Sequence, residues 1–293
     1  MIGEKRVGRL RKTKDKDEMQ MKEIDFNRIQ SRLNEYKYFS MEYLDYSDVS
    51  EYEILFEDDN LILLLGYNSD IECKQYHWAA NEANDLLEQI KSTETCFISF
   101  VPQEWVEDLE KVGFVIYSKW QDYFMASLES IPDHMNAVLL NENECDKASE
   151  VTLSCKGQSR GFTGQTKEWV QEWLDNSENS IRETGIQNKT IIIERNESDE
   201  IIGLVCTGTY AHDSIKGAIV WIREVAVKPA YQRKGIARRL IMEALSYGKK
   251  HGAKRAFLAA DECNIYAIHL YESIGFLASE EKGQIDMIRE LKN

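Results

Sequence analysis

The sequence predicts an α/β protein, with strands and helices mixed in each of two units of similar layout. The chain has 293 residues, more than the roughly 100–200 that are usual for one domain. In both halves, apolar runs of strand length alternate with segments of helical period. A polar, proline-containing break at Ile131-Pro132 lies between the halves, because the residue before proline is disfavoured in helix. We therefore predict a domain boundary near residue 130.

The first half reads as strand, helix, strand, helix and strand. The pattern predicts strands over 61–67, 96–101 and 114–128, and helices over 79–91 and 103–112. A regular amphipathic pattern begins only near Ile24. Residues 21–130 are therefore predicted to form the first unit.

The second half repeats this order with clearer breaks. We expect helices over 145–155 and 167–177, then strands over 190–195, 201–210 and 217–227. A long helix over 235–250 follows, with Ile236, Leu240, Ala244 and Leu245 at helical spacing. A strand over 255–260, a helix over 265–274 and a closing strand over 284–291 complete the unit, which is predicted to span residues 131–293.

The first sixteen residues hold seven basic and two acidic side chains, in a chain whose net charge is −15. Such a charge block is usually a solvated tail, so residues 1–20 are predicted to be disordered. An arm that binds nucleic acid or a protein partner is the alternative, and an incorrectly early start codon is another.

Composition narrows the class of protein. The apolar runs are far shorter than a membrane span, and no apolar core of an export signal follows the first residues, so we expect a protein of the cytoplasm without a membrane partner. The six cysteines form no CxxC pair, which argues against a zinc knuckle or a disulfide framework. The acidic balance makes general nucleic-acid binding unlikely and favours a cationic partner.

One segment is more specific than this background. Between the strand that ends near Val227 and the helix that begins near Gly235 lies a short basic loop. The unpaired amides at a helix N-terminus, together with the helix dipole, bind anions such as a diphosphate. Gly235 lets the backbone approach such a ligand closely, and Ala237 is nearly as small.

The spacing in this loop resembles that of a known family. Gln232-Arg233-Lys234-Gly235-Ile236-Ala237 matches the pyrophosphate signature of the GNAT superfamily, the acyl-CoA-dependent N-acetyltransferases: Gln or Arg, two residues, Gly, one residue, then Gly or Ala. Residues 264–276 resemble the second conserved block of the family, at the expected distance. The resemblance covers about residues 131–293 and implies a mixed, mostly antiparallel sheet flanked by helices, with two splayed strands that hold acyl-CoA.

The resemblance also implies the cofactor-binding residues. The pantetheine arm would pair with the strand around Val225, Ala226 and Val227. Asn264 matches a polar residue that commonly contacts this arm, and Ala267 follows it in the block. The pyrophosphate would be held by the loop and helix start, that is by Gln232, Arg233, Lys234, Gly235, Ile236, Ala237 and Arg238. The implied co-substrate is acetyl-CoA, and no metal is expected.

Two residues are the implied catalytic groups. Tyr271 matches the tyrosine that commonly protonates the departing CoA thiolate, since a placed acid neutralises the negative charge that develops on sulfur. Glu224 resembles the frequent general base, which takes a proton from the attacking amine. The alternative for Glu224 is a structural carboxylate paired with Arg223 or another base.

The rest of the site is less specific. The acceptor region of relatives corresponds to about residues 156–175, where the pair Trp169 and Trp173 is more typical of a core than of a substrate platform. The first half resembles a second GNAT unit but has 68–78 where a glycine loop belongs. We expect it not to bind CoA, and instead to scaffold, to shape the acceptor cleft or to form an oligomer interface such as that of a homodimer.

These observations predict an N-acetyltransferase that acts by direct transfer on a primary amine of a small molecule or peptide. The main alternative is a regulatory or structural protein that binds acyl-CoA without turnover. Retention of Tyr271, Asn264 and Glu224 favours the enzyme.

Overall fold

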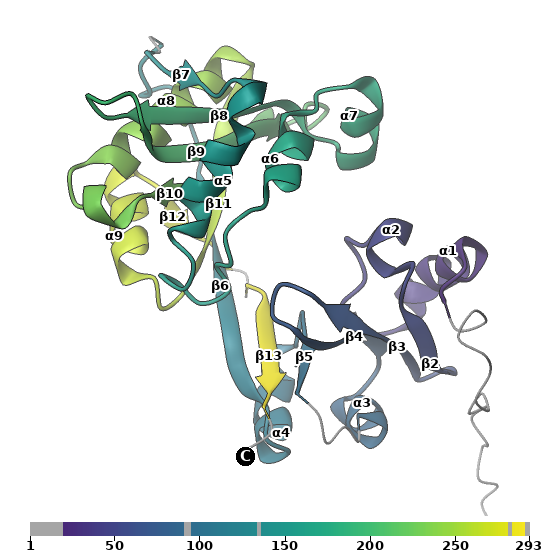
Figure 1. The fold of residues 1–293 in the computed structure, drawn as a ribbon. Coiled ribbons are helices and arrows are strands. Elements are labelled where there is room, and N and C mark those ends of the chain that lie inside the picture. The colour runs from purple at the N-terminus through teal and green to yellow at the C-terminus, as the bar shows by residue number, and fades with distance from the viewer. Residues whose placement is uncertain (1–19, 91–94, 134–135, 281–282, 291–293) are drawn as a thin grey trace, which may run out of the picture. The chain divides into compact units, whose positions relative to one another are not determined.

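The computed structural model describes residues 20–90, 95–133, 136–280 and 283–290, so the predicted tail lies outside the described residues, apart from residue 20. The described chain forms two compact units, shown in Figure 1. Unit 1 contains residues up to Lys119 and those from Gln284 onward, and unit 2 is Trp120–Gly283. The boundary therefore differs from the one predicted near residue 130.

Strand pairing explains this difference. The strand β6 (Val115–Met125) is continuous, but its first half pairs with β13 (Ile285–Arg289) in unit 1 and its second half pairs with β11 (Ala253–Asp261) in unit 2. The last strand of the chain thus belongs to unit 1. A local sequence signal such as Pro132 cannot reveal pairing between strands that are far apart in the sequence.

Unit 1 is a mixed sheet with helices on both faces. Its strands lie in the order β2 (Glu53–Glu57), β3 (Leu61–Asn68), β4 (Cys73–Ala80), β5 (Cys96–Ile98), β13 and the first half of β6. Ile62 and Leu64 pack with α1 (Glu23–Arg32) and α2 (Tyr46–Val49), and Leu61 and Leu63 pack with α3 (Ala83–Gln89) and α4 (Val106–Lys111). This alternation follows from the two-residue period of a strand. Short elements are β1 (Tyr38–Phe39), η2 (Leu33–Glu35) and η3 (Gln103–Trp105).

The helix predicted over 79–91 was wrong in its first turn, because Ala79 and Ala80 end strand β4. The segment 68–78, taken as the counterpart of a glycine loop, contains a turn and most of this strand. Both faces of β4 are buried from Gln75 to Ala80. A strand buried on both faces shows no apolar–polar alternation, so its sequence resembles that of a buried helix.

Unit 2 has the same order of elements. Three antiparallel strands, β8 (Gln187–Arg195), β9 (Ile201–Tyr210) and β10 (Ala218–Val227), are followed by helix α8 (Ile236–Lys250), the parallel strand β11 and helix α9 (Ile265–Ile274). In unit 1 the same sequence of elements is β2, β3, β4, α3, β5 and α4. The predicted α/β class and the mixed, largely antiparallel sheets are confirmed.

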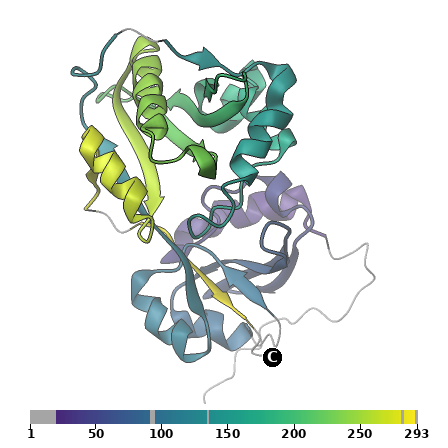
Figure 2. The same ribbon diagram turned by 60° about the vertical axis from the view of Figure 1, so that its left-hand side comes forward.

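Two layers of helix cover the sheet of unit 2. On one face α8 and α9 pack over the strands (Figure 2), and on the other lie α5 (Cys145–Leu153) and α6 (Lys167–Leu174). The remaining elements are β7 (Val138–Leu139), η4 (Glu142–Glu144), η5 (Pro229–Tyr231), β12 (Leu277–Ala278) and α7 (Glu178–Thr184), of which α7 is a helix that the sequence pattern did not predict.

Helix α8 approaches β10 most closely at Gly248. A Cβ at this position would lie 2.3–2.9 Å from side-chain atoms of Val220, which is fully buried. We expect Gly248→Ala to lower the free energy of unfolding by about 1–3 kcal/mol, because a rigid β-branched side chain cannot yield. Chemical denaturation measures this, and the loss should shrink in a Val220→Ala background. A stabilised single variant, as expected for alanine at an unconstrained helical glycine, would contradict the close packing.

Candidate acetyl-transfer site

The central strands of unit 2 separate. β10 and β11 pair in parallel only over Ala218–Trp221, after which β10 continues to Val227 and β11 continues to Asp261 without pairing to each other. The amide of Lys228 donates to Ile202 on β9 at 2.9 Å. Successive residues of a strand direct their backbone groups to opposite edges. Because Lys228 faces β9, Val225 and Val227 direct their backbone groups away from β9, into the gap between β10 and β11.

A β-bulge lies where the strands part. Ile222 is paired with Thr207 of β9 and Glu224 with the next residue, Cys206, so Arg223 is the extra residue. A bulge places two consecutive side chains on the same side of a sheet. Accordingly, the guanidinium of Arg223 lies over the ring of Trp169 on α6, and Glu224 contacts Gln165 just before α6.

Glu224 is a buried carboxylate held by one amide. The Nε2 of Gln165 donates to its Oε2 at 3.1 Å. Burial raises the pKa of Glu224, while the nearby charge of Arg223 and the bond from Gln165 lower it in part. Among the described residues Glu224 forms no ion pair within 4.0 Å, with Arg223 or otherwise. A carboxylate with a raised pKa is suited to accept a proton near neutral pH.

Tyr271 on α9 is the second group of the predicted pair. Its ring packs near those of Tyr123 and Phe276, with centroid distances of 6.5 and 6.3 Å. The surrounding protein raises the pKa of Tyr271 to about 12, and the charge of Glu224 adds to this. The phenol of Tyr271 is therefore protonated at neutral pH.

The loop before α8 has the shape that its sequence predicts. Gly235 is the N-cap of α8 with a φ of +76°, and Arg233 also has a positive φ, of +59°. No side chain caps the helix, and the first backbone bond of its N-terminal turn is donated by Arg239 to Gly235. The amides of Ile236, Ala237 and Arg238 therefore remain available, as an anion site at a helix N-terminus requires.

The basic side chains of this loop differ in their partners. Arg239 forms an ion pair with Glu194 at 2.6 Å, so its charge is already compensated. Arg238 donates to the hydroxyl of Ser273, and Lys234 lies 5.0 Å from the ring centroid of Tyr231. Arg233 forms no ion pair among the described residues. Among the described residues, no carboxylate thus forms an ion pair with Arg233, Lys234 or Arg238.

Three predicted contacts have other roles in the structure. The side chain of Gln232 donates to the carbonyl of Val227 at 3.0 Å and to Gln158 at 2.6 Å, which folds the loop back on the strand. Asn264 is the N-cap of α9, and its side chain accepts from the amide of Ala267 at 3.3 Å. The amide of Ala267 is therefore occupied, whereas the NH₂ group of Asn264 is not used by this cap.

Residues 156–165, between α5 and α6, connect the parts of the site. Gln158 contacts the α8 loop, Arg160 pairs with the buried carboxylate of Asp261 at 3.1 Å, and Gln165 holds Glu224. The backbone of Gln165 is fixed in turn by the hydroxyl of Thr152, at 2.8 Å. We did not predict Gln158 or Gln165 as individual site residues, because no spacing rule distinguishes a glutamine in a loop of this kind.

In the described part of unit 1, the equivalent strand edge and helix start are both occupied. There the strand β1 pairs with the end of β4, at Tyr38–Ala80 and Phe39–Ala79, beyond the short stretch where β4 pairs with β5. Helix α3 begins with a capping box made by Glu82 and Asp85, so acidic side chains occupy its first amides.

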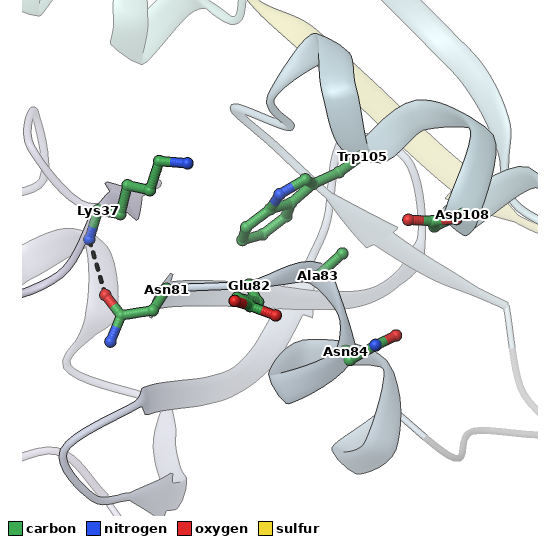
Figure 3. A pocket seen from close by; sticks show the side chains of 7 residues that line it. All are labelled: Lys37, Asn81, Glu82, Ala83, Asn84, Trp105 and Asp108. Atoms are coloured by element: carbon green, nitrogen blue, oxygen red, sulfur yellow. Dashed lines mark hydrogen bonds between the residues drawn. The ribbon is translucent and has the colours of Figure 1, made fainter.

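A hollow of the described structure lies beside this helix start. It has a volume of about 410 Å³, and Figure 3 shows Lys37, Glu82, Trp105 and Asp108 around it. The backbone amide of Lys37 donates to Asn81 at 3.0 Å. Its lining mixes one cation with two carboxylates, so it offers no concentration of positive charge for the phosphates of CoA.

Comparisons with known proteins agree with the geometry of unit 2. The model of the acetyltransferase (GNAT) family matches residues 159–276, which include the bulge, the α8 loop and α9. Residues 159–276 thus belong to the GNAT family, as the motifs predicted.

The curated relatives match only parts of the chain. The mycothiol acetyltransferase of Renibacterium salmoninarum is 34% identical over 80 residues, which cover 27% of this chain and 24% of the relative. The spermine/spermidine N(1)-acetyltransferase of Bacillus subtilis is 26% identical over 98 residues, which cover 31% of this chain and 64% of that enzyme. The chain thus spans about a quarter of the first relative and somewhat under two thirds of the second.

Solved structures show the fold over most of the chain. A GCN5-related N-acetyltransferase from Sphaerobacter thermophilus is similar with a TM-score of 0.52 and 13% identity, over 80% of this chain and 81% of the other. A GNAT-family acetyltransferase from Colwellia psychrerythraea has a TM-score of 0.52 and 10% identity, over 94% and 98%. At such identities the likeness concerns the fold alone.

None of the helices in the described residues is long and apolar enough to cross a membrane. No three histidine, cysteine, aspartate or glutamate side chains of these residues gather in a way that could hold a metal ion.

Proposed function

We propose that the protein is an N-acetyltransferase that moves the acetyl group of acetyl-CoA directly to a primary amine. One observation supports this most strongly: the buried carboxylate of Glu224, whose pKa is raised, lies on β10 just beyond the point where β10 and β11 separate, and its charge acts on the phenol of Tyr271. The raised pKa of Glu224 suits a base, and the raised pKa of Tyr271 keeps its phenol protonated, and so able to donate, at neutral pH.

The residues of unit 2 fit acetyl-CoA. The free amides at 236–238, the Cβ-free Gly235 and the uncompensated Arg233, Lys234 and Arg238 would hold the pyrophosphate. The backbone of Val225 and the amide of Val227, whose carbonyl already accepts from Gln232, would pair with the pantetheine arm along β10, with Ala226 between them. Asn264 would offer its NH₂ group to the same arm.

The reaction needs one base and one acid. Glu224 takes a proton from the ammonium form of the acceptor, and the neutral nitrogen attacks the carbonyl carbon of the thioester. A C–N bond forms, the C–S bond breaks, and the nitrogen loses its second proton to solvent, to which the protonated Glu224 also releases its own. Tyr271 donates its proton to the departing sulfur, and the phenol regains a proton from solvent. The products are the N-acetylated amine and CoA with a free thiol.

We further propose that unit 1 does not bind CoA and acts as a scaffold. Its own strand β1 occupies the edge of β4 that an extended ligand would pair with, and acidic side chains cap α3. An oligomer interface, such as that of a homodimer, and a contribution to the acceptor cleft remain proposals for this unit.

The alternative of an acyl-CoA-binding protein without turnover predicts that Tyr271 can lose its hydroxyl without consequence. We instead expect Tyr271→Phe to lower kcat by about 10²–10⁴-fold while the affinity for acetyl-CoA changes little, because only the transition state uses the proton. Thiol release from acetyl-CoA in the presence of an amine panel measures this.

Tyr247→Phe is the matched control, since it removes another hydroxyl whose pKa is raised by burial, from α8. Unchanged transfer by Tyr271→Phe, with the same pH dependence, would refute the acid assignment.

A further inference from the structure

Arg223 is an exposed cation whose charge no carboxylate of the described chain compensates within 4.0 Å. The protein is rich in acid, with 51 acidic against 36 basic side chains. In such a chain an arginine would readily find an ion-pair partner, as Arg160, Arg195 and Arg239 do.

The guanidinium of Arg223 is instead held by two indoles. Its central carbon lies 5.0 Å from the ring centroid of Trp221 and 5.8 Å from that of Trp169. Contacts with aromatic faces leave the N–H edges of a guanidinium free, and those edges match the two oxygens of a carboxylate or phosphate.

The two indoles are themselves fixed. Trp169 stacks on Trp173 with a centroid distance of 5.6 Å and an interplanar angle of 8°. Trp173 is buried, donates its ring N–H to the carbonyl of Thr190 at 3.0 Å and meets Trp221 edge to face. Arg223 therefore lies on a preorganised aromatic support, and little freedom would be lost when its N–H groups bind an anion.

The bulge places this cation next to the base. Arg223 and Glu224 are consecutive, and both side chains project toward α6 and the loop before it. A molecule whose amine reaches Glu224 therefore places a neighbouring group near Arg223. An additional ammonium there would be repelled, whereas an oxyanion would be attracted.

We propose that the acceptor is a primary amine that carries an oxyanion, a carboxylate or a phosphomonoester, a few bonds from the reacting nitrogen, and that Arg223 binds this oxyanion. This inference rests on the proposed function. It replaces the cationic acceptor suggested by the net charge of the chain. Arg223 lies next to the base and so close to the bound acceptor, whereas most acidic side chains lie farther away, where salt screens their charge.

Matched acceptor pairs test the inference. Thiol release from acetyl-CoA is measured with amino acids against their amides, and with phosphoethanolamine against ethanolamine; spermidine is included. We expect kcat/KM to favour the anionic member of at least one pair by about 10–100-fold, the usual range for a charge-assisted hydrogen bond. The pair that shows the preference distinguishes the carboxylate from the phosphate.

In Arg223→Met, which keeps an unbranched stem against the indoles, we expect this preference to fall to within about 2-fold, with the loss in KM for the anionic acceptor rather than in acetyl-CoA binding. Arg182→Met, an exposed arginine on α7, is the control and should retain it. Stabilisation by acetyl-CoA, read as a rise in melting temperature, verifies that each variant is folded.

A preference for amides or spermidine, or an anion preference that survives Arg223→Met, would overturn the inference and leave the proposed function standing. Acetyl-CoA binding without acetylation of any amine would contradict the proposed function, and the inference with it.

Discussion

Glu224→Gln is expected to lower kcat by about two to four orders of magnitude, since the amide cannot accept the proton of the acceptor ammonium. The substitution keeps the size of the side chain and an oxygen that can accept from Gln165. Acetyl-CoA affinity should therefore remain within a few-fold of the native value. Steady-state kinetics beside calorimetric binding separates the two effects.

The pH dependence follows from the direction of the pKa shift. Burial raises the pKa of Glu224 above its ordinary value of 4.5, and the base must be ionised to act. Activity of the native protein should consequently fall as the pH decreases through this raised pKa. The residual activity of Glu224→Gln should not show this fall at low pH.

The stability of the fold should change with pH in the opposite direction to the activity. A carboxyl whose pKa is raised on folding stabilises the fold below its unfolded pKa, and this contribution is lost as the pH rises through the folded pKa. Above the folded pKa the ionised Glu224 therefore destabilises the fold, and Glu224→Gln should there melt at a higher temperature than the native protein. Near pH 4 the difference should largely vanish.

Glu150→Gln, on the exposed side of α5, is the matched control and should alter neither property. Near-native turnover by Glu224→Gln would show that the carboxylate is structural, which is the alternative that the sequence left open.

Gly235→Glu is expected to weaken acetyl-CoA binding by at least about 100-fold. The new side chain would start from a residue with a φ of +76°, its Cβ would lie 3.3 Å from Arg239, and its charge would oppose the pyrophosphate. A ligand at 100 times its Kd stabilises a protein by about 2.7 kcal/mol, so the native melting temperature should rise on adding acetyl-CoA and that of the variant should not.

Gly252→Glu is the control for backbone strain. Gly252 has a similar positive φ, of +90°, just after the other end of α8, and nothing lies within 4 Å of its Cβ position. This variant should lose some stability yet keep the response to acetyl-CoA. An equal loss of response in both variants would mean that strain, and not the pyrophosphate site, explains the effect.

Much of the site could be predicted because its geometry is local. A strand, a glycine-bearing loop and a helix start are adjacent in sequence, so Gly235, Arg233 and the free amides of α8 follow from spacing and from the backbone preferences of glycine. The N-cap role of Asn264 is equally local, although Asn264 was predicted only as a contact of the pantetheine arm.

The remaining features depend on pairing between distant segments. The bulge at Arg223 arises from the register of β10 against β9, and the contact of Gln165 with Glu224 joins residues 59 positions apart. Similarly, β13 pairs in unit 1 although it ends the chain. No local pattern encodes these pairings, and for this reason Arg223 was considered only as an ion-pair partner of Glu224.

Calorimetric titration of the native protein with acetyl-CoA tests the central claim, a single cofactor site formed by unit 2, most directly. We predict one site per chain, and no detectable binding to Gly235→Glu under the same conditions. Absence of binding to the native protein would contradict the account, and two sites per chain would show that unit 1 also binds the cofactor.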